Sequence, residues 1–266
     1  VATKVLTPRQ AVVLAAGMNL LGALAGTAVA KTISSGLVDT NVVAITSEIL
    51  ICALTGGIIW NLITWWLGLP SSSSHALVGG LCGAAIAAAH GNFDALVWSQ
   101  TAGDWTQNKG LLWKVVVPMV SSPIAGFTLG VVMIGGFMAI ISTMNGAGGW
   151  LARISRPRWV NAFFGKAQIA SAAYMGFAHG TNDAQKTMGI IALAIFGAEA
   201  AGTLNGLPSW LSFLHPNGKE GDIDTWIVFT CAIVMAMGTA AGGWRIIKTL
   251  GHKMVKLHPT DGFAAE

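Results

Sequence analysis

Long stretches without a charged residue are the feature that most constrains this fold. They cover residues 10–30, 49–93 and 115–152, and residues 226–244 form a shorter one. About 20 such residues suffice to cross a bilayer as an α-helix. Only 10% of the 266 residues are charged, against about 25% in soluble domains. The sequence therefore predicts an all-α, polytopic membrane protein rather than an unusually apolar soluble domain.

The charged residues lie mostly between these runs and indicate how the chain is oriented. The net charge of +4 is small and confined to loops, so it indicates membrane orientation and not nucleic-acid binding. The positive-inside rule places two basic clusters in the cytoplasm: Arg153, Arg156, Arg158 and Lys166, then Arg245, Lys248, Lys253 and Lys256. The loop between them is expected outside and carries four acids: Glu199, Glu220, Asp222 and Asp224. Residues 160–199 then cross once, as a discontinuous helix, and residues 225–246 return.

The three cysteines give no sign of a metal site. Cys52, Cys82 and Cys231 all lie in apolar runs, too far apart for a local metal-binding motif. We expect them to pack as small hydrophobic side chains.

One polar stretch interrupts the apolar sequence at residues 180–187. It carries an acid, a base, an amide and a hydroxyl: Asp183, Lys186, Asn182 and Thr187. Ionisable groups at membrane depth are costly and usually mark a site. With a half-helix beginning near Ala184, the amide and acid lie at its N-cap, and the acid, base and hydroxyl share one face. The free amide groups and positive helix end would then bind an anion. The alternative is a purely structural ion pair.

A second polar stretch, Pro-Ser-Ser-Ser-Ser-His at residues 70–75, lies inside the longest charge-free run. Its hydroxyls are an N-cap signal for the small-residue helix expected at 76–89. Non-helical backbone at membrane depth must be buried or line a wet cavity, which favours a re-entrant or broken helix over an ordinary loop. Two half-helix N-termini that converge are a recurring design of secondary transporters. An anion could be held by six side chains: Ser72, Ser73, Ser74, Asn182, Lys186 and Thr187.

The acid beside the base narrows the choice of anion. Asp183 can accept a hydrogen bond from protonated phosphate, whereas sulfate offers none at neutral pH. Asp183 can also bind Na⁺ or, with its pKa raised by burial, carry a coupled proton. Glu48 is a further candidate for cation coupling, although a paired or solvated carboxylate near the membrane surface is the favoured interpretation. His75 and His179 adjoin the motifs, and packing is the commoner role for such histidines.

At these residues the chain resembles the inorganic phosphate transporter (Pit) family. Residues 179–189, His-Gly-Thr-Asn-Asp-Ala-Gln-Lys-Thr-Met-Gly, resemble the family's second-repeat Asn-Asp motif, with Thr181 in place of the usual Ala. Residues 70–80, Pro-Ser-Ser-Ser-Ser-His-Ala-Leu-Val-Gly-Gly, resemble its first-repeat hydroxyl motif, with serines in place of Val and two Thr. The first Asn-Asp motif would lie before Val1 and the second hydroxyl motif after Glu266. We therefore expect the chain to be a piece of a longer protein.

The resemblance implies an inverted-repeat secondary transporter of the plasma membrane with discontinuous or re-entrant helices. Residues 1–150 would hold part of the first repeat with a connecting span, and residues 151–266 part of the second with a basic cytoplasmic linker. The implied function is phosphate import by Na⁺ or H⁺ symport, without an organic cofactor. Phosphate or its coupling cation would be bound by Ser72, Ser73, Ser74, Asn182, Asp183, Lys186 and Thr187. The expected partners are phosphate, the coupling ion, the bilayer and, in an oligomer, further copies of the chain.

Two other classes of function remain open from sequence. An intramembrane serine hydrolase would use a serine of residues 71–74 activated by His75 or His179, but no single nucleophile or Gly-x-Ser-x-Gly elbow is present. A cation channel would line its pore with Glu48 and Asp183. Covalent labelling by a fluorophosphonate would support the hydrolase, and ion currents independent of phosphate would support the channel.

Overall fold

The computed structural model describes residues 3–27, 37–39, 41–101, 108–217, 222–241, 243–249 and 258–266. Several residues considered in the sequence analysis lie outside these ranges. They are the acidic Glu220, and Lys253 and Lys256 of the second basic cluster.

The described residues are mainly helical and include no strand, only two isolated bridges. The longer helices are α1 (Pro8–Leu24), α3 (Ser47–Leu67), α4 (Ser73–Ala88), α5 (Val117–Gly146), α7 (Pro157–Ala200) and α8 (Thr225–Ala241). The shorter helical segments are η1 (Phe93–Ala95), η3 (Leu112–Val116), α6 (Gly149–Ile154), η4 (Ser209–Leu214), α9 (Trp244–Lys248) and α10 (Pro259–Ala265). The prediction of an all-α chain is confirmed.

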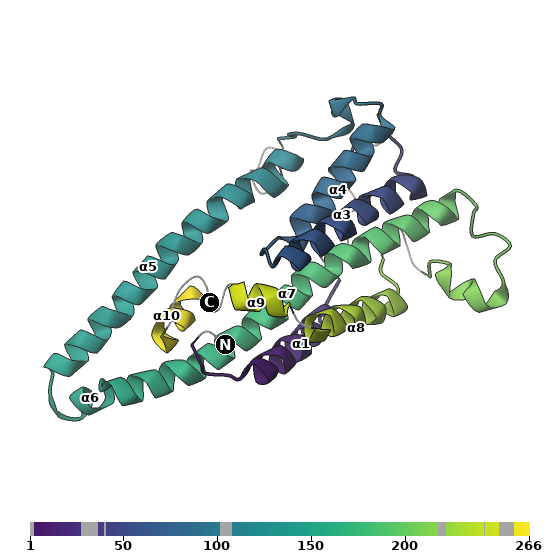
Figure 1. Cartoon of the computed structure of the whole chain (residues 1–266). Helices are drawn as coiled ribbons and strands as arrows, with labels where there is room; N and C mark the ends of the chain where they lie inside the picture. Colours follow the sequence, from purple (N-terminus) through teal and green to yellow (C-terminus); the bar gives the residue numbers. More distant parts are fainter. Residues whose placement is uncertain are drawn as a thin grey trace.

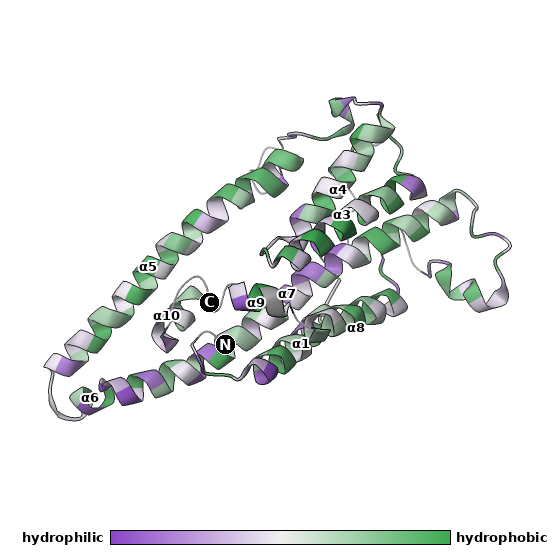
Figure 2. Ribbon diagram, in the orientation of Figure 1, coloured by the Kyte–Doolittle hydropathy of each residue, from purple (hydrophilic) through white to green (hydrophobic). Residues whose placement is uncertain are grey.

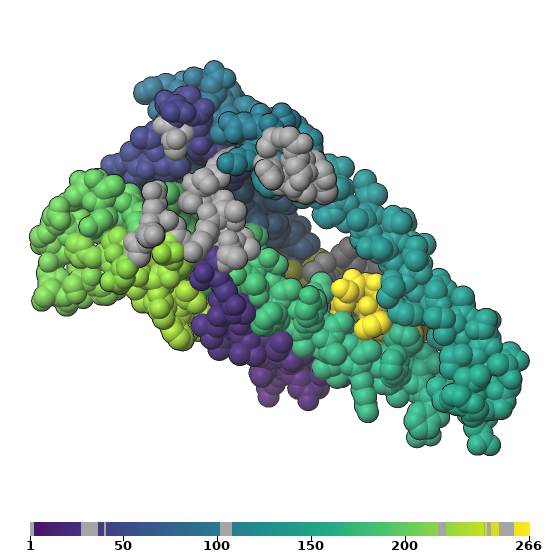
Figure 3. Space-filling model, turned by 180° about the vertical axis from the view of Figure 1, so that it is seen from behind, coloured from purple at the N-terminus to yellow at the C-terminus, as the bar shows by residue number. Residues whose placement is uncertain are grey.

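The long helix α7 is the axis of the molecule (Figure 1). α1 and α8 pack against it and against each other, and α3 and α4 form a hairpin whose α3 arm contacts α7. α5 stands apart from this bundle, and α10 contacts both α5 and α7. Seen from behind, α10 lies in the space between those two helices (Figure 3). Segments far apart in the sequence therefore meet along α7.

Polar side chains fix where several of these helices begin. Thr7 and Gln10 form a capping box at the start of α1. Thr46 caps α3, which ends at Gly68 in the left-handed conformation, with φ +69°. The Ser72 hydroxyl accepts a bond from the backbone N–H of His75 at 3.3 Å and caps α4. The predicted helix start in the serine run is thus confirmed, although the helix begins at Ser73.

In the part of the chain that the structure describes, two helices are long and apolar enough to cross a membrane: Ser47–Leu67 and the continuous segment Leu112–Gly146, which joins η3 to α5. α4 and α8 are apolar but shorter. None of the residues of α5 is buried, and hydrophobic residues follow its whole length (Figure 2). An exposed apolar helix of this kind suits contact with lipid chains better than contact with water.

α7 is a continuous α-helix of 44 residues. The predicted discontinuity near Ala184 is therefore wrong, and Asn182 and Asp183 do not lie at an N-cap. The polar side chains next to Asp183 find partners within the helix. Thr181 Oγ1 donates to the carbonyl of Phe177 at 3.0 Å, and Asn182 Nδ2 donates to that of Ala178 at 2.9 Å. Bonds to the carbonyl four residues back satisfy these groups inside a helix.

The largest buried cluster joins α1, α7 and α8. Its buried members are Ala23, Ala184, Met188, Ile227, Cys231 and Ala232. Two glycines lie at the crossing of α1 and α7. A Cβ atom on Gly22 would meet the Phe177 carbonyl, and one on Gly180 would meet the backbone of Asn19. The close approach at Gly22 and Gly180 is typical of membrane helices packed through small residues, and it brings the polar stretch of α7 against α1.

Candidate functional site

The two polar stretches predicted from sequence meet in space. Within α7, Lys186 Nζ donates to Asp183 Oδ1 at 2.7 Å, as their spacing predicted. Lys186 also donates to the hydroxyl of Ser74 in the first turn of α4, 112 residues away in sequence. Ser74 Oγ lies 3.4 Å from Asp183 Oδ1. The N-terminus of α4 thus contacts the middle of α7 through charged and hydroxyl groups.

His179 contacts the other oxygen of the same carboxyl group. Its Nε2 lies 3.2 Å from Asp183 Oδ2, because residues four apart lie on one face of a helix. Asp183 and Lys186 are partly buried, with side chains 24% and 27% exposed, so solvent screens this pair less than a surface ion pair. One acid surrounded by a lysine, a histidine and a hydroxyl leaves donors available for an anion.

Sequence analysis did not single out Asn19 or Thr239, which extend this cluster. Asn19 Oδ1 lies 2.9 Å from His179 Nδ1, and Asn19 Nδ2 donates to Thr239 Oγ1 at 3.0 Å. Asn19 is buried on α1, and Thr239 belongs to α8. The sequence signal was a polar side chain inside a charge-free run, which identifies neither partner. We name the linked side chains Thr239, Asn19, His179, Asp183, Lys186 and Ser74 the polar chain.

Four of the predicted binding residues lie beside the polar chain without a bond to it. Asn182 and Thr187 are exposed on α7, and Asn182 bonds to a carbonyl of its own helix. Ser72 serves as the N-cap of α4, and Ser73 is exposed in its first turn. Each is within three residues of a member of the polar chain, and their part in binding stays a prediction.

Glu48 lies away from the polar chain. It is exposed in the first turn of α3, whereas the polar chain adjoins the other end of the α3–α4 hairpin. The rise from Glu48 to Leu67 is about 28 Å at 1.5 Å per residue. The structure therefore does not bring Glu48 and Asp183 into one pore lining, which was the basis of the channel alternative. His75 is exposed beside Ser74.

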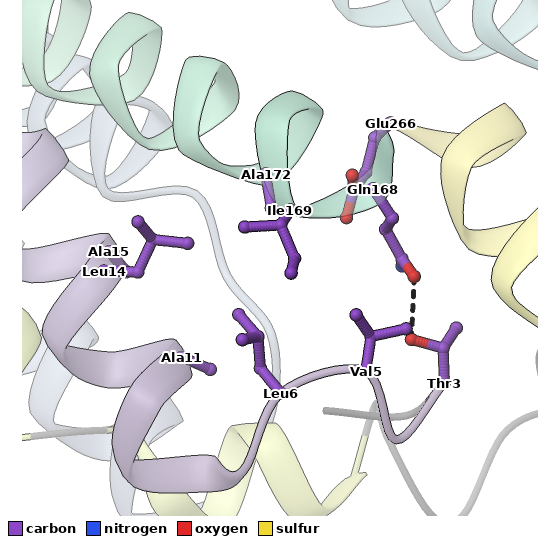
Figure 4. Close-up of a pocket in the computed structure, with 10 residues that line it drawn as sticks. All are labelled: Thr3, Val5, Leu6, Ala11, Leu14, Ala15, Gln168, Ile169, Ala172 and Glu266. Carbon is purple, nitrogen blue, oxygen red and sulfur yellow. Dashed lines mark hydrogen bonds between the residues drawn. The ribbon is translucent and has the colours of Figure 1, made fainter. Parts of the chain in front are cut away.

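A pocket between the N-terminal segment, α1 and α7 lies apart from these groups (Figure 4). Its lining is mostly aliphatic, and its polar side includes the bond from Thr3 Oγ1 to Gln168 Oε1 at 2.8 Å. Gln168 precedes Asp183 by about 22 Å of helical rise along α7. Within the described ranges, no three His, Cys, Asp or Glu side chains gather into a group suited to a metal ion.

A helical bundle with exposed apolar helices and a charged group held between them defines a membrane protein with an internal polar site. The comparisons with known proteins agree with this class. Residues 1–266 match the model of the phosphate transporter family. The chain belongs to that family.

Curated relatives resemble the chain along its entire length. The probable low-affinity inorganic phosphate transporter of Mycobacterium tuberculosis (strain CDC 1551 / Oshkosh) is 42% identical over 271 residues, which cover 100% of this chain and 54% of the relative. The protein of the same name from Bacillus subtilis (strain 168) is 41% identical over 266 residues, covering 100% of this chain and 68% of the relative. The chain thus spans about half the length of its mycobacterial relatives.

A solved structure described as "The sodium-dependent phosphate transporter" has a similar fold. Its TM-score is 0.68 at 20% identity, over 99% of this chain and 74% of that chain. The family and its relatives are transporters and not enzymes. The prediction that the chain is not an enzyme is therefore confirmed, and the serine hydrolase alternative is set aside.

Proposed function

We propose that the protein containing this chain imports inorganic phosphate across the plasma membrane by symport with Na⁺ or H⁺. The observation that carries this proposal is the contact of Ser74 with Lys186 and Asp183. It joins the two motifs on which the resemblance to phosphate transporters depends. The names of the relatives and of the solved structure support the same substrate and, for the solved structure, sodium as the coupling ion.

In this proposal α7 and the start of α4 supply different groups to the phosphate site. Lys186 supplies a positive charge and the serines at the start of α4 supply hydroxyl donors, which suit the oxygens of phosphate. Asp183 accepts a hydrogen bond from a protonated phosphate oxygen or interacts with the coupling cation. Ser72, Ser73, Asn182 and Thr187 complete the proposed set, and the transporter needs no organic cofactor.

Alternating access follows from the proposed repeat organisation. Residues 1–150 and 151–266 contribute to two inverted repeats, with α4 as a re-entrant helix that presents its N-terminus to the anion. α1 of the first segment packs against α7 and α8 of the second, so the two segments share one bundle. The whole protein is multi-pass, and phosphate is bound between its repeats.

Uptake of labelled phosphate tests this function. The full-length protein is reconstituted in proteoliposomes, and the Na⁺ and pH gradients are imposed separately. We expect accumulation with at least one gradient and none without either. Equal uptake with and without both gradients would rule out symport, and no uptake of phosphate under any gradient would rule out the substrate.

The site is tested in the same assay with a matched pair of variants. Asp183→Asn leaves the Lys186 ammonium without its carboxylate partner, and we expect uptake to fall by roughly 100-fold or more. Asp94→Asn changes an exposed carboxylate of η1 and is expected to keep uptake unchanged. Normal uptake by Asp183→Asn at equal protein level would reject the role of this residue.

A further inference from the structure

The hydrogen bonds of the polar chain have a direction, which starts at α8. The Thr239 hydroxyl donates its proton to the carbonyl of Met235 at 2.9 Å. A hydroxyl has one proton and two acceptor positions, so Thr239 Oγ1 is left to accept. Its partner at 3.0 Å is Asn19 Nδ2, an amide nitrogen that donates. Thr239 therefore selects which end of the Asn19 amide turns toward it.

The orientation of Asn19 in turn decides the protonation of His179. With its nitrogen bonded to Thr239, Asn19 presents Oδ1 to His179 Nδ1 at 2.9 Å. An amide oxygen can only accept, so Nδ1 carries the proton. Asn19 is 4% exposed, and an unpaired amide at this depth would be costly. Burial thus holds the amide to this pair of partners.

The remaining nitrogen of His179 faces the site. Nε2 lies 3.2 Å from Asp183 Oδ2, and the other carboxylate oxygen is bonded by Lys186. Nε2 of an imidazole protonated at Nδ1 is an acceptor, as is a carboxylate oxygen. Their contact is attractive only when a second proton lies between them, on the ring or on the carboxyl group.

We propose that Asn19 and Thr239 are positioning residues that fix His179 in the Nδ1-protonated form, so that Nε2 shares a proton with Asp183. Neither residue touches the proposed phosphate contacts, and both act through the ring of His179. The inference rests on the proposed function in assigning the site to transport. The protonation of the ring itself can be measured without transport.

Nitrogen NMR of the full-length protein with ¹⁵N-labelled histidine tests the proposal, and His179→Gln identifies the His179 signals. In the wild type we expect a protonated Nδ1. Asn19→Leu removes the acceptor of the Nδ1 proton, so Nδ1 should lose that proton to solvent, while the proton shared by Nε2 and Asp183 stays and the neutral ring donates from Nε2. An unprotonated Nδ1 in the wild type, or a protonated Nδ1 that persists in Asn19→Leu, would overturn the proposal.

Conservative substitutions of Thr239 test the same proposal and do not require the Asn19→Leu variant to fold. Thr239→Val removes the acceptor of the Asn19 amide while keeping the side chain's shape, and Thr239→Ser keeps the hydroxyl. We expect Thr239→Val to shift the His179 signals toward the Nε2-protonated form and Thr239→Ser to match the wild type. Thr230→Val changes an exposed threonine of α8 outside the polar chain and serves as the control. Identical His179 signals in Thr239→Val and Thr239→Ser would contradict the proposal.

Phosphate uptake by the same variants distinguishes the two proposals. Loss of one orienting hydrogen bond should reduce uptake about fivefold in Thr239→Val and leave Thr239→Ser near the wild type. If no variant and no wild-type protein transports phosphate, the proposed function fails while the NMR result still decides the role of Asn19 and Thr239. If the ring shifts as expected and uptake is unchanged, the positioning role in transport is rejected.

Discussion

Gly22 and Gly180 show how single residues set the geometry of the site. Each glycine faces the backbone of the opposite helix where α1 crosses α7. Because there is no side chain at either position, the helices approach closely enough for Asn19 to reach His179. The hydrogen bond at 2.9 Å between those residues depends on this crossing.

We predict that Gly22→Ala destabilises the protein by about 1–3 kcal/mol, the usual cost of overpacking a tight contact. The added methyl group would meet the Phe177 carbonyl and force α1 away from α7. Gly17→Ala on the same helix is the control, because a Cβ there meets no atom within 4 Å. That change should be neutral or stabilising by up to about 1 kcal/mol. Thermal unfolding in detergent measures both, and equal melting temperatures for the two variants would refute the prediction.

At the residue scale, the sequence predicted the ion pair and the helix cap better than it predicted hydrogen bonds between different helices. The Asp183–Lys186 pair follows from their spacing on one helix, and the N-cap in the serine run follows from residue type. The sequence analysis expected Ser74 and Lys186 to hold one anion, but their direct contact depends on how the α3–α4 hairpin lies against α7. Asn19 could not be assigned, because one amide in an apolar run does not reveal which side chains it will face.

Helix α7 shows where sequence reasoning fails at the level of an element. A polar stretch in an apolar run was interpreted as a helix break, since unwound backbone and helix ends are common at transport sites. The helix is continuous, and Thr181 and Asn182 bond to carbonyls of its preceding turn. Their side chains obtain hydrogen-bond partners without any unwinding, and no proline lies within the helix beyond its first turn. Helix propensity alone cannot decide between these two outcomes.

Hydrogen–deuterium exchange distinguishes a continuous α7 from a broken one. We predict slow exchange for the backbone amides of residues 178–188, because each has an acceptor within the helix. The exposed backbone amide of Gly206, in the turn after the helix, provides a fast-exchanging reference in the same protein. Amides of residues 182–185 that exchange as fast as this reference would show that the helix is interrupted there.

At the scale of the whole molecule, α7 is longer than the membrane is thick. Its 44 residues extend about 66 Å, against roughly 40–45 Å for a bilayer with its headgroups. The helix must therefore tilt or project beyond the membrane. Its first turns carry the basic residues Arg158 and Lys166, and acidic Glu199 lies in its last turn. The charges at its ends thus differ in sign, which predicts an orientation.

Cysteine labelling tests that orientation in a protein whose Cys52, Cys82 and Cys231 are replaced. By the positive-inside rule, Asn161→Cys at the basic end of α7 should face the cytoplasm, and Ser209→Cys beyond its acidic end should face outside. Both positions are exposed. A membrane-impermeant maleimide should label Ser209→Cys in intact cells and Asn161→Cys only after the cells are permeabilised. The reverse pattern would contradict the proposed topology.

The contacts of α7 with α1 and with α4 are expected to differ in stiffness, and each forms a joint between α7 and its neighbour. On the α1 side the helices approach through glycines at the backbone, with the buried cluster beside them. On the α4 side the described contact includes the hydroxyl of Ser74 and the flexible ammonium of Lys186. A force that separates helices from α7 is expected to open the second joint first, while the bond between His179 and Asn19 persists. The molecule would then move as a stiff block of α1, α7 and α8 against a compliant α3–α4 arm, with the proposed phosphate contacts at the line where they part.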